Sequence, residues 1–242
     1  MRIYRVYDIF SLPAEEINLN KENSHHLGTV LRCQIGEICH VFDGDGNEVK
    51  TKISAIARAK ITVVFLENID NRTESPLKIH LFQALCKGDK MDTIIQKAVE
   101  LGVFAITPLT TERCDVKLSG ERLENKMLHW RNIMINATEQ SGRAVLAHLN
   151  SPLTLQEAIH QQSENLCLLF TPHTEKKLSD FPVPVNNYAA IFVGPEGGFS
   201  EPETAWAIHQ NVEAIVLGRR VLRTETAPMA IMASLQTLWG DF

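Results

Sequence analysis

The pattern of apolar residues changes near Pro76, and this change constrains the fold more than any other feature of the chain. Before it, short β-branched runs such as Lys60–Leu66 alternate with clusters of turn residues such as Asp43–Asn47. After it, apolar strand candidates alternate with helix candidates. Closely spaced short strands are typical of a small β-barrel, and the later alternation is typical of an α/β domain with a mainly parallel sheet. We therefore predict two domains, residues 1–72 and residues 73–242.

The second domain is expected to contain five strands and four helices. The strand candidates are Ile79–Leu85, Val103–Leu109, Leu166–Phe170, Ala189–Val193 and Ala214–Leu217. The helix candidates are a segment capped by Asp89 that ends at Gly102, then Glu121–Glu139, a helix opened by the capping-box sequence Ser200–Glu203, and Ala227–Trp239.

The composition is that of an ordinary globular protein, with 44% hydrophobic and 22% charged residues. No apolar run reaches the roughly 18–20 residues that cross a bilayer, and no signal-peptide core is present, so we expect a cytoplasmic protein without a membrane partner. The net charge of −5 argues against a protein that coats nucleic acid nonspecifically, but it allows a local basic surface that binds one structured RNA.

The five cysteines are scattered and form no C-x-x-C pair, which indicates free thiols in a reducing compartment. His25 and His26 could contribute to a metal site, but adjacent histidines on an extended segment point to opposite faces. We therefore expect no metal site.

The turn Gly194-Pro195-Glu196-Gly197-Gly198 directly follows one strand candidate and precedes a capped helix. Ligands of parallel α/β sheets bind beyond the carboxyl ends of the strands, and glycines there let the backbone approach a ligand closely. The turn fits neither the P-loop pattern nor the dinucleotide pattern G-x-G-x-x-G. It is therefore either a tight structural turn or one wall of a site for another kind of ligand.

A second strand exit that contains glycine, Leu217–Ala227, precedes the last helix candidate, so two neighbouring loops are expected to meet at one ligand. Its arginines can make charge-assisted contacts to phosphate or carboxylate, and Thr224 or Thr226 can cap the helix. The alternative is a solvated basic loop with an ordinary cap. We favour a functional role for Arg223–Thr226, whereas both interpretations stay open for Arg219 and Arg220.

A third polar group, Glu139, Gln140 and Arg143, lies at the end of the long helix candidate. Gly142 could simply end that helix, and Arg143 could face water. A carboxylate, an amide and a guanidinium this close together could also orient a pyrimidine edge or an RNA phosphate.

Together these segments resemble the signature of bacterial small-subunit rRNA uridine-N3 methyltransferases, a family of the SPOUT class. The resemblance rests on Gly194–Gly198, Leu217-Gly218, Val221–Ala227 and Glu139–Arg143, in the expected order. It extends to Ala84–Met91, Ile95–Gly102, His25–Leu27, Val30–Arg32 and Phe42–Gly44, and so covers nearly the whole chain.

The resemblance implies a C-terminal α/β domain with a trefoil knot, which ordinary topology rules would exclude, an N-terminal PUA-like β-barrel that binds RNA, and a homodimer. It also implies S-adenosylmethionine as the cofactor and 16S rRNA or the small ribosomal subunit as the partner. The cofactor-binding residues would be Leu169, Phe170, Thr171, Gly194, Pro195, Glu196, Gly197, Gly198, Leu217, Gly218, Leu222, Arg223, Thr224, Thr226 and Ala227. The RNA-binding residues would be His25, His26, Arg32, Lys87 and Arg143.

Three positions depart from the family pattern. Thr29 stands where arginine is expected, Cys86 where proline is usual, and Arg219 where proline or another residue is common. Thr29 matters most, because the loss of a cation in the barrel could weaken or reposition the contact with RNA.

Methyl transfer to uracil N3 requires that the N3 proton be removed and the base be unstacked. We expect Arg223 or Arg143 to stabilise the developing anion and Glu196 or Glu139 to accept or relay the proton, although Glu196 could equally be a hydrogen-bonded turn residue. A carboxylate acting in this way needs a raised pKa. Two alternatives stay open: a related knotted methyltransferase acting on a ribose 2′-hydroxyl, and a noncatalytic RNA-binding assembly factor.

Overall fold

The computed structural model describes residues 3–11, 15–57, 60–162, 165–172 and 174–242. The chain divides into two compact units, of which the first comprises Met1–Glu74 and Thr138–Leu146, and the second Ser75–Ala137 and Ala147–Phe242. The sequence placed a boundary after residue 72 and assigned 138–146 to the second domain, whereas the structure groups that segment with the first unit. Residues 1–2, 12–14 and 58–59 of the predicted first domain lie outside the described residues.

The first unit is built on a five-stranded sheet in the order β1-β3-β4-β5-β2. Its strands are β1 (Tyr4–Tyr7), β2 (Glu16–Asn18), β3 (Ile38–Phe42), β4 (Glu48–Ala57) and β5 (Lys60–Ile69). β1 runs parallel to β3, and the other neighbours pair antiparallel. Alternate apolar side chains such as Val41, Val49 and Val63 are fully buried and form the core of this unit. The predicted β-rich first domain is therefore confirmed.

A short helical segment lies between β2 and β3, made of α1 (Lys21–His25) and the π-helical turn η1 (His26–Val30). Asn20 caps α1 by accepting a hydrogen bond from the backbone nitrogen of Asn23 at 2.8 Å. The expectation of an extended segment at His25 and His26 was therefore wrong. No group of three histidine, cysteine or acidic side chains that could hold a metal occurs within the residues described.

The second unit contains a seven-stranded sheet in the order β12-β10-β11-β6-β7-β8, with β9 paired to β7. The strands are β6 (Lys78–Ala84), β7 (Val103–Thr110), β8 (His148–Leu149), β9 (Leu153–Thr154), β10 (Leu166–Phe170), β11 (Tyr188–Val193) and β12 (Glu213–Ile215). Every pairing is parallel, as the alternation of strands and helices predicted. β12 is shorter than predicted and ends at Ile215.

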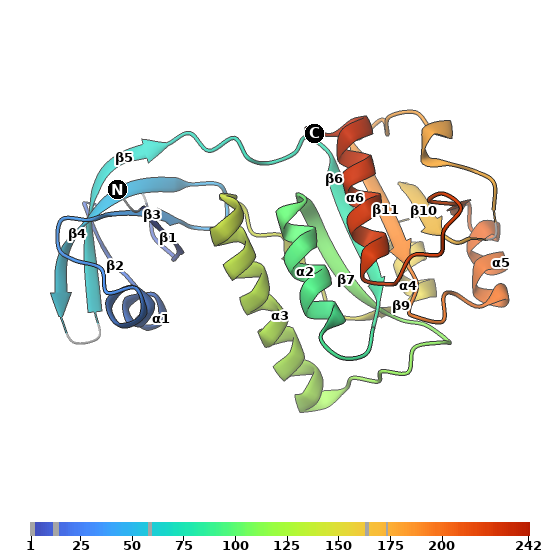
Figure 1. Ribbon diagram of the computed structural model, residues 1–242, viewed down its shortest axis with the longest axis horizontal. Helices are drawn as coiled ribbons and strands as arrows, with labels where there is room; N and C mark the ends of the chain where they lie inside the picture. The colour runs from blue at the N-terminus through green and yellow to red at the C-terminus, as the bar shows by residue number, and fades with distance from the viewer. Residues whose placement is uncertain (1–2, 12–14, 58–59, 163–164, 173) are drawn as a thin grey trace. The chain divides into compact units, whose positions relative to one another are not determined.

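Helices cover both faces of this sheet. One core joins side chains of α2 (Lys90–Glu100), α3 (Gly120–Ser141) and α6 (Thr226–Trp239) to β6 and β11, with Ile94, Trp130 and Ile231 among the buried residues. The other core joins α4 (Leu155–Gln161) and α5 (Glu201–His209) to the opposite face. Figure 1 shows α2 and α6 side by side over the sheet. None of the described helices has the length and apolar character needed to cross a bilayer.

Two predicted helix starts had different outcomes. Ser200 caps α5 in a reciprocal capping box with Glu203, as its sequence predicted. The prediction that Thr224 or Thr226 caps α6 was wrong, because the N-cap residue is Glu225. The Thr224 hydroxyl instead donates a hydrogen bond to the carbonyl oxygen of Gly194 at 2.8 Å.

Candidate functional site

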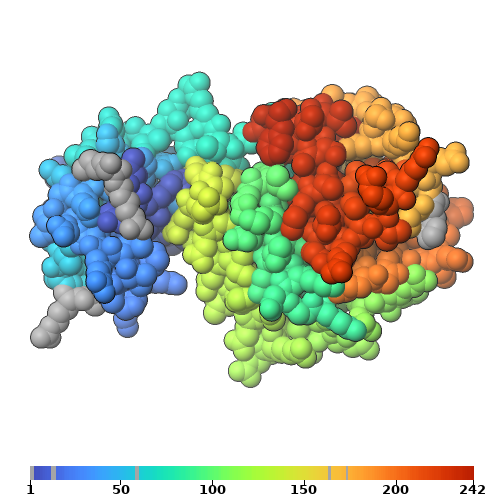
Figure 2. Space-filling view, in the orientation of Figure 1, coloured from blue at the N-terminus to red at the C-terminus, as the bar shows by residue number. Residues whose placement is uncertain are grey.

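A cleft of about 530 Å³ lies beyond the carboxyl ends of β10 and β11 in the second unit. Three segments form its walls, together with Lys90 and Arg113: Phe170–Pro172 at the end of β10, Val193–Phe199 at the end of β11, and Val221–Glu225 before α6 with Ala227 in the first turn of that helix. A smaller hollow shares Phe170, Thr171 and Leu222 with it and adds Leu217 and Gly218. The segment before α6, coloured orange-red, lies at the surface in Figure 2. This is the edge at which parallel sheets bind their ligands.

The glycine turn is closed tightly on itself. The backbone nitrogen of Gly198 donates to the carbonyl oxygen of Pro195 at 2.9 Å, and Gly198 has a φ of 67°. A Cβ at Gly194 would lie 3.0 Å from the backbone nitrogen of Phe199, closer than a side chain tolerates without movement of the backbone. Glycine is therefore favoured at 194 by the close approach of the backbone and at 198 by the left-handed conformation.

Thr224 joins the two glycine-bearing loops. Its side chain is buried, donates to Gly194 and accepts a hydrogen bond from Nε2 of Gln83, at the end of β6, at 3.2 Å. The Sγ of Cys86 lies 3.4 Å from the same hydroxyl. Burial raises the pKa of the Cys86 thiol to about 11, so it stays protonated at neutral pH. Cys86 departs from the family pattern, and the structure accommodates its thiol as a buried, uncharged group beside the hydroxyl of Thr224.

Glu196 is held at the cleft by the start of α2. Its Oε1 accepts hydrogen bonds from Nζ of Lys90 at 2.7 Å and from the backbone nitrogen of Lys87 at 3.2 Å. Partial burial favours the protonated carboxyl, but the hydrogen bond from Lys90 and its charge outweigh this and lower the pKa of Glu196. The shift is opposite to the one that a proton acceptor needs.

Glu225 adds a second carboxylate to the cleft. Its Oε2 is buried and makes no hydrogen bond to any residue that the structure describes, and Nζ of Lys90 lies 3.8 Å away. Its Oε1 lies 4.0 Å from the guanidinium of Arg223, whose side chain is 85% exposed. The cleft therefore places a partly buried negative charge beside two cations.

Most of the predicted cofactor-binding residues meet at this cleft or the adjoining hollow. Those lining the cleft are Phe170, Thr171, Gly194, Pro195, Glu196, Gly197, Gly198, Leu222, Arg223, Thr224 and Ala227. Leu169 instead packs in the core between the sheet and helices α4 and α5. Thr226 lies in the first turn of α6 and lines neither the cleft nor the hollow.

Sequence reasoning missed Lys90, Arg113, Pro172, Val193 and Phe199 as lining residues. Glu225 was predicted only as part of the functional segment Arg223–Thr226. Lys90 lies within a segment that carries the family resemblance, and Pro172, Val193 and Phe199 adjoin predicted site residues. Arg113 has only one signal, its place after the strand β7.

Glu139 and Arg143 lie in the first unit, where both have structural partners. Glu139 accepts a hydrogen bond from the backbone nitrogen of Tyr7 at 2.9 Å, and burial raises its pKa. Arg143 is only 4% exposed, and its guanidinium pairs with both carboxylate oxygens of Glu74 at 2.9 and 2.6 Å. Their part in the chemistry stays a prediction.

The other predicted RNA-binding residues are accessible. His25, His26 and Arg32 are exposed on the first unit, and Thr29 is exposed between them in sequence. Lys87 is exposed on the second unit, where its Nζ pairs with Asp115 at 2.7 Å.

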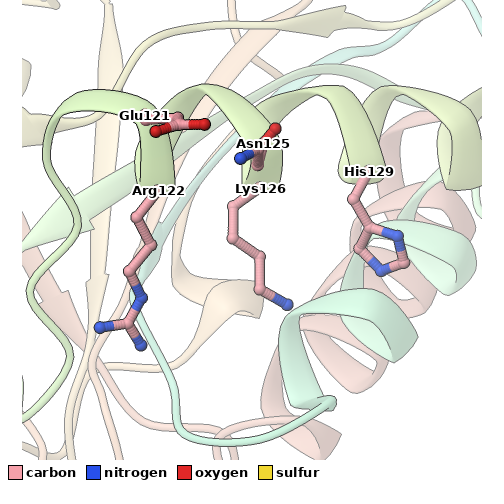
Figure 3. A pocket seen from close by; sticks show the side chains of 5 residues that line it. All are labelled: Glu121, Arg122, Asn125, Lys126 and His129. Atoms are coloured by element: carbon pink, nitrogen blue, oxygen red, sulfur yellow. The ribbon is translucent and has the colours of Figure 1, made fainter.

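A different hollow lies on one face of α3. Figure 3 shows the side chains of Arg122, Lys126 and His129 on the same side of the helix, and Nε2 of His129 lies 2.7 Å from Asp92. All of its lining residues come from this one helix, and none of them was a predicted site residue. The loop cleft is therefore the better candidate site.

The second unit is a parallel α/β unit with a cleft that loops build at its carboxyl edge, and the first unit is a small β unit. These features define a class of two-domain ligand-binding proteins. Comparison with known families narrows this class. The model of the RNA methyltransferase domain matches residues 73–236, and that of the RNA methyltransferase PUA domain matches residues 19–66. The chain belongs to this RNA methyltransferase family.

Individual relatives agree over nearly the full length. The chain is 34% identical to the ribosomal RNA small subunit methyltransferase E of Buchnera aphidicola subsp. Schizaphis graminum, covering 99% of this chain and 98% of that protein. It is similar to the crystal structure of a ribosomal RNA small subunit methyltransferase E from Neisseria gonorrhoeae bound to S-adenosyl methionine, with 37% identity, a TM-score of 0.94 and full coverage of both chains (100% each).

Proposed function

We propose that this protein transfers a methyl group from S-adenosylmethionine to N3 of a uridine in the 16S rRNA of the small ribosomal subunit. The cleft carries this proposal, because three loops that resemble the family's cofactor loops meet there, and the hydrogen bond of Thr224 to Gly194 joins two of them. The full-length similarity to ribosomal RNA small subunit methyltransferases supports the substrate class.

The residues of the cleft fit the cofactor. The volume of about 530 Å³ suits a ligand of this size, since small-molecule sites span about 300–1,000 Å³. Phe170, Leu222 and Ala227 offer apolar walls for an adenine ring, and the glycine turn offers peptide groups. The buried Oε2 of Glu225 would balance the positive charge of a sulfonium. S-adenosylmethionine supplies an activated methyl group when bound.

The chain's own residues would bind and orient the base and handle its proton. Arg223, exposed at the cleft, is proposed to stabilise the developing uracil anion, with Arg143 as the other candidate. Of the two proposed proton acceptors, Glu196 lines the cleft but has a lowered pKa, whereas Glu139 has a raised pKa but lies in the first unit. Glu196 is better suited to holding Lys90 in place.

The family resemblance adds finer features to the proposal. We infer a trefoil knot in the second unit, a barrel-like closure of the RNA-binding first unit, a homodimer and a cytoplasmic location. His25, His26, Arg32 and Lys87 would contact the RNA.

The test is to incubate the purified protein with labelled S-adenosylmethionine and with rRNA, assembled small subunits or tRNA, and then to map the modified nucleoside. We expect N3-methyluridine in small-subunit rRNA. A 2′-O-methylated product would contradict the choice of base over ribose and leave methyl transfer intact. Absence of cofactor binding in calorimetry would favour a noncatalytic assembly factor instead.

A further inference from the structure

The segment after β7 crosses the cleft's edge and is tied to three separate parts of the second unit. The backbone nitrogen of Glu112 donates to Oε1 of Glu203 in α5 at 2.8 Å. Arg113 donates from NH1 to the carbonyl oxygen of Gly197 at 2.8 Å, and Asp115 pairs with Lys87. The bond of Glu112 to α5 and the bond of Arg113 to Gly197 place Arg113 at the glycine turn.

The side chain of Arg113 lies directly over that turn. A Cβ on Gly197 would be 3.4 Å from both Cβ and Cδ of Arg113, so the aliphatic stem packs against the glycine. NH1 also reaches the carbonyl oxygen of Phe199 at 3.4 Å. Both hydrogen bonds come from the same terminal nitrogen. Within the described residues, Nε and the other terminal nitrogen make no hydrogen bond, which leaves an edge of the guanidinium available to a ligand.

The charge of Arg113 is not neutralised. Lys87, Lys90 and Arg223 each lie within 4.0 Å of a carboxylate oxygen. Arg113 has no such partner among the residues for which the structure gives positions, although it lines the cleft. A guanidinium edge with two parallel N–H groups matches the two oxygens of a phosphate.

We propose that Arg113 binds a backbone phosphate of the RNA and thereby holds the target nucleotide at the mouth of the cleft. The inference rests on the proposed function in taking RNA as the substrate. Phosphate contacts position a nucleic acid without reading its sequence, so Arg113 acts on RNA affinity rather than on the choice of base.

The test compares Arg113→Met with the wild type. Methionine keeps an unbranched apolar stem over Gly197 but removes the charge and the donors. Calorimetry measures the Kd for S-adenosylmethionine, and filter binding measures the Kd for an unmodified small-subunit rRNA transcript between 50 and 200 mM KCl. Arg131→Met, an exposed arginine on α3 outside the cleft, is the matched control.

For Arg113→Met we expect RNA binding weakened about 10- to 100-fold, the loss typical of a charge-assisted hydrogen bond. The slope of log K against log salt should shrink by about 0.7, the value for one phosphate contact on a single strand. The Kd for S-adenosylmethionine should change less than about threefold. Arg113→Lys should restore the slope but only part of the affinity, because an ammonium lacks the planar fork.

An unchanged salt slope together with weaker cofactor binding would overturn the proposal, since Arg113 would then brace the turn or bind the cofactor's carboxylate. A wild-type protein that binds neither the transcript nor the assembled small subunit would instead contradict the proposed function. If the wild type binds the RNA and Arg113→Met binds it equally well, only the role of Arg113 would be overturned.

Discussion

Arg223 is the cleft residue whose chemistry can be separated most cleanly from folding. Its side chain is 85% exposed, and the carboxylate of Glu225 is 4.0 Å away. Exposed pairs of this kind contribute little to stability, so Arg223→Ala should change the free energy of unfolding by less than about 0.5 kcal/mol. If Arg223 stabilises the uracil anion, turnover should fall about 100-fold or more.

The measurements are kcat with rRNA and urea unfolding of the same preparation. Arg219→Ala is the matched control, because Arg219 is exposed in the same loop but is not among the residues lining the cleft or the adjoining hollow. It should keep wild-type turnover. Unchanged turnover in Arg223→Ala would remove Arg223 from the mechanism.

Between elements, a single hydroxyl joins the loop before α6 to the glycine turn after β11. Thr224→Val keeps the shape of the side chain but removes the donor to Gly194 and the acceptor for Gln83. Leaving buried polar groups unpaired costs about 1–3 kcal/mol. We therefore expect a lower Tm and a Kd for S-adenosylmethionine raised about tenfold. Thr224→Ser retains the hydroxyl and should stay near the wild type in calorimetry; equal affinities in the two variants would show that the bridge does not shape the site.

The outcome at Thr224 illustrates which features of the elements can be predicted from sequence. Ser200 caps α5 through Glu203 three residues away, a local interaction that its spacing reveals. Thr224 has the same local preference for a cap, but its hydroxyl bonds to a residue 30 positions away. The bond to Gly194 forms only when the chain folds and brings the two loops together, and the sequence does not show that Gly194 is the partner of Thr224.

The same limit applies to the end of α3. The sequence predicts a long helix over Glu121–Glu139, and α3 indeed spans Gly120–Ser141. Arg143 just beyond it pairs with Glu74, and Glu139 accepts from Tyr7, residues that are distant in sequence. These pairings explain why 138–146 belongs to the first unit, although the pattern of strands and helices continues past it without a break. The sequence pattern predicts the helix, whereas the grouping of its last residues with the first unit depends on contacts to residues that are distant in sequence.

At the scale of the whole molecule, a buried histidine makes the stability of the second unit depend on pH. The ring nitrogens of His80 lie 2.7 Å from the hydroxyl of Tyr188 and 2.8 Å from that of Thr107. Burial, with a smaller contribution from His148, lowers the pKa of His80 from 6.5 to about 4. The unfolded chain therefore takes up a proton near pH 6.5, while the folded protein resists protonation down to about pH 4.

Since the unfolded state binds more protons between these values, stability is greatest above pH 6.5 and falls as the pH drops towards 4, by up to about 3 kcal/mol from this residue. All 3 tryptophans, Trp130, Trp206 and Trp239, lie in the second unit, so their fluorescence follows its unfolding separately. His80→Gln retains a polar, uncharged side chain and should flatten the pH dependence between 4.5 and 6.5 relative to the wild type in urea titrations. Carboxylates titrate in both proteins, so the difference between the two curves isolates His80. Parallel curves would mean that His80 is protonated equally in the folded and unfolded states.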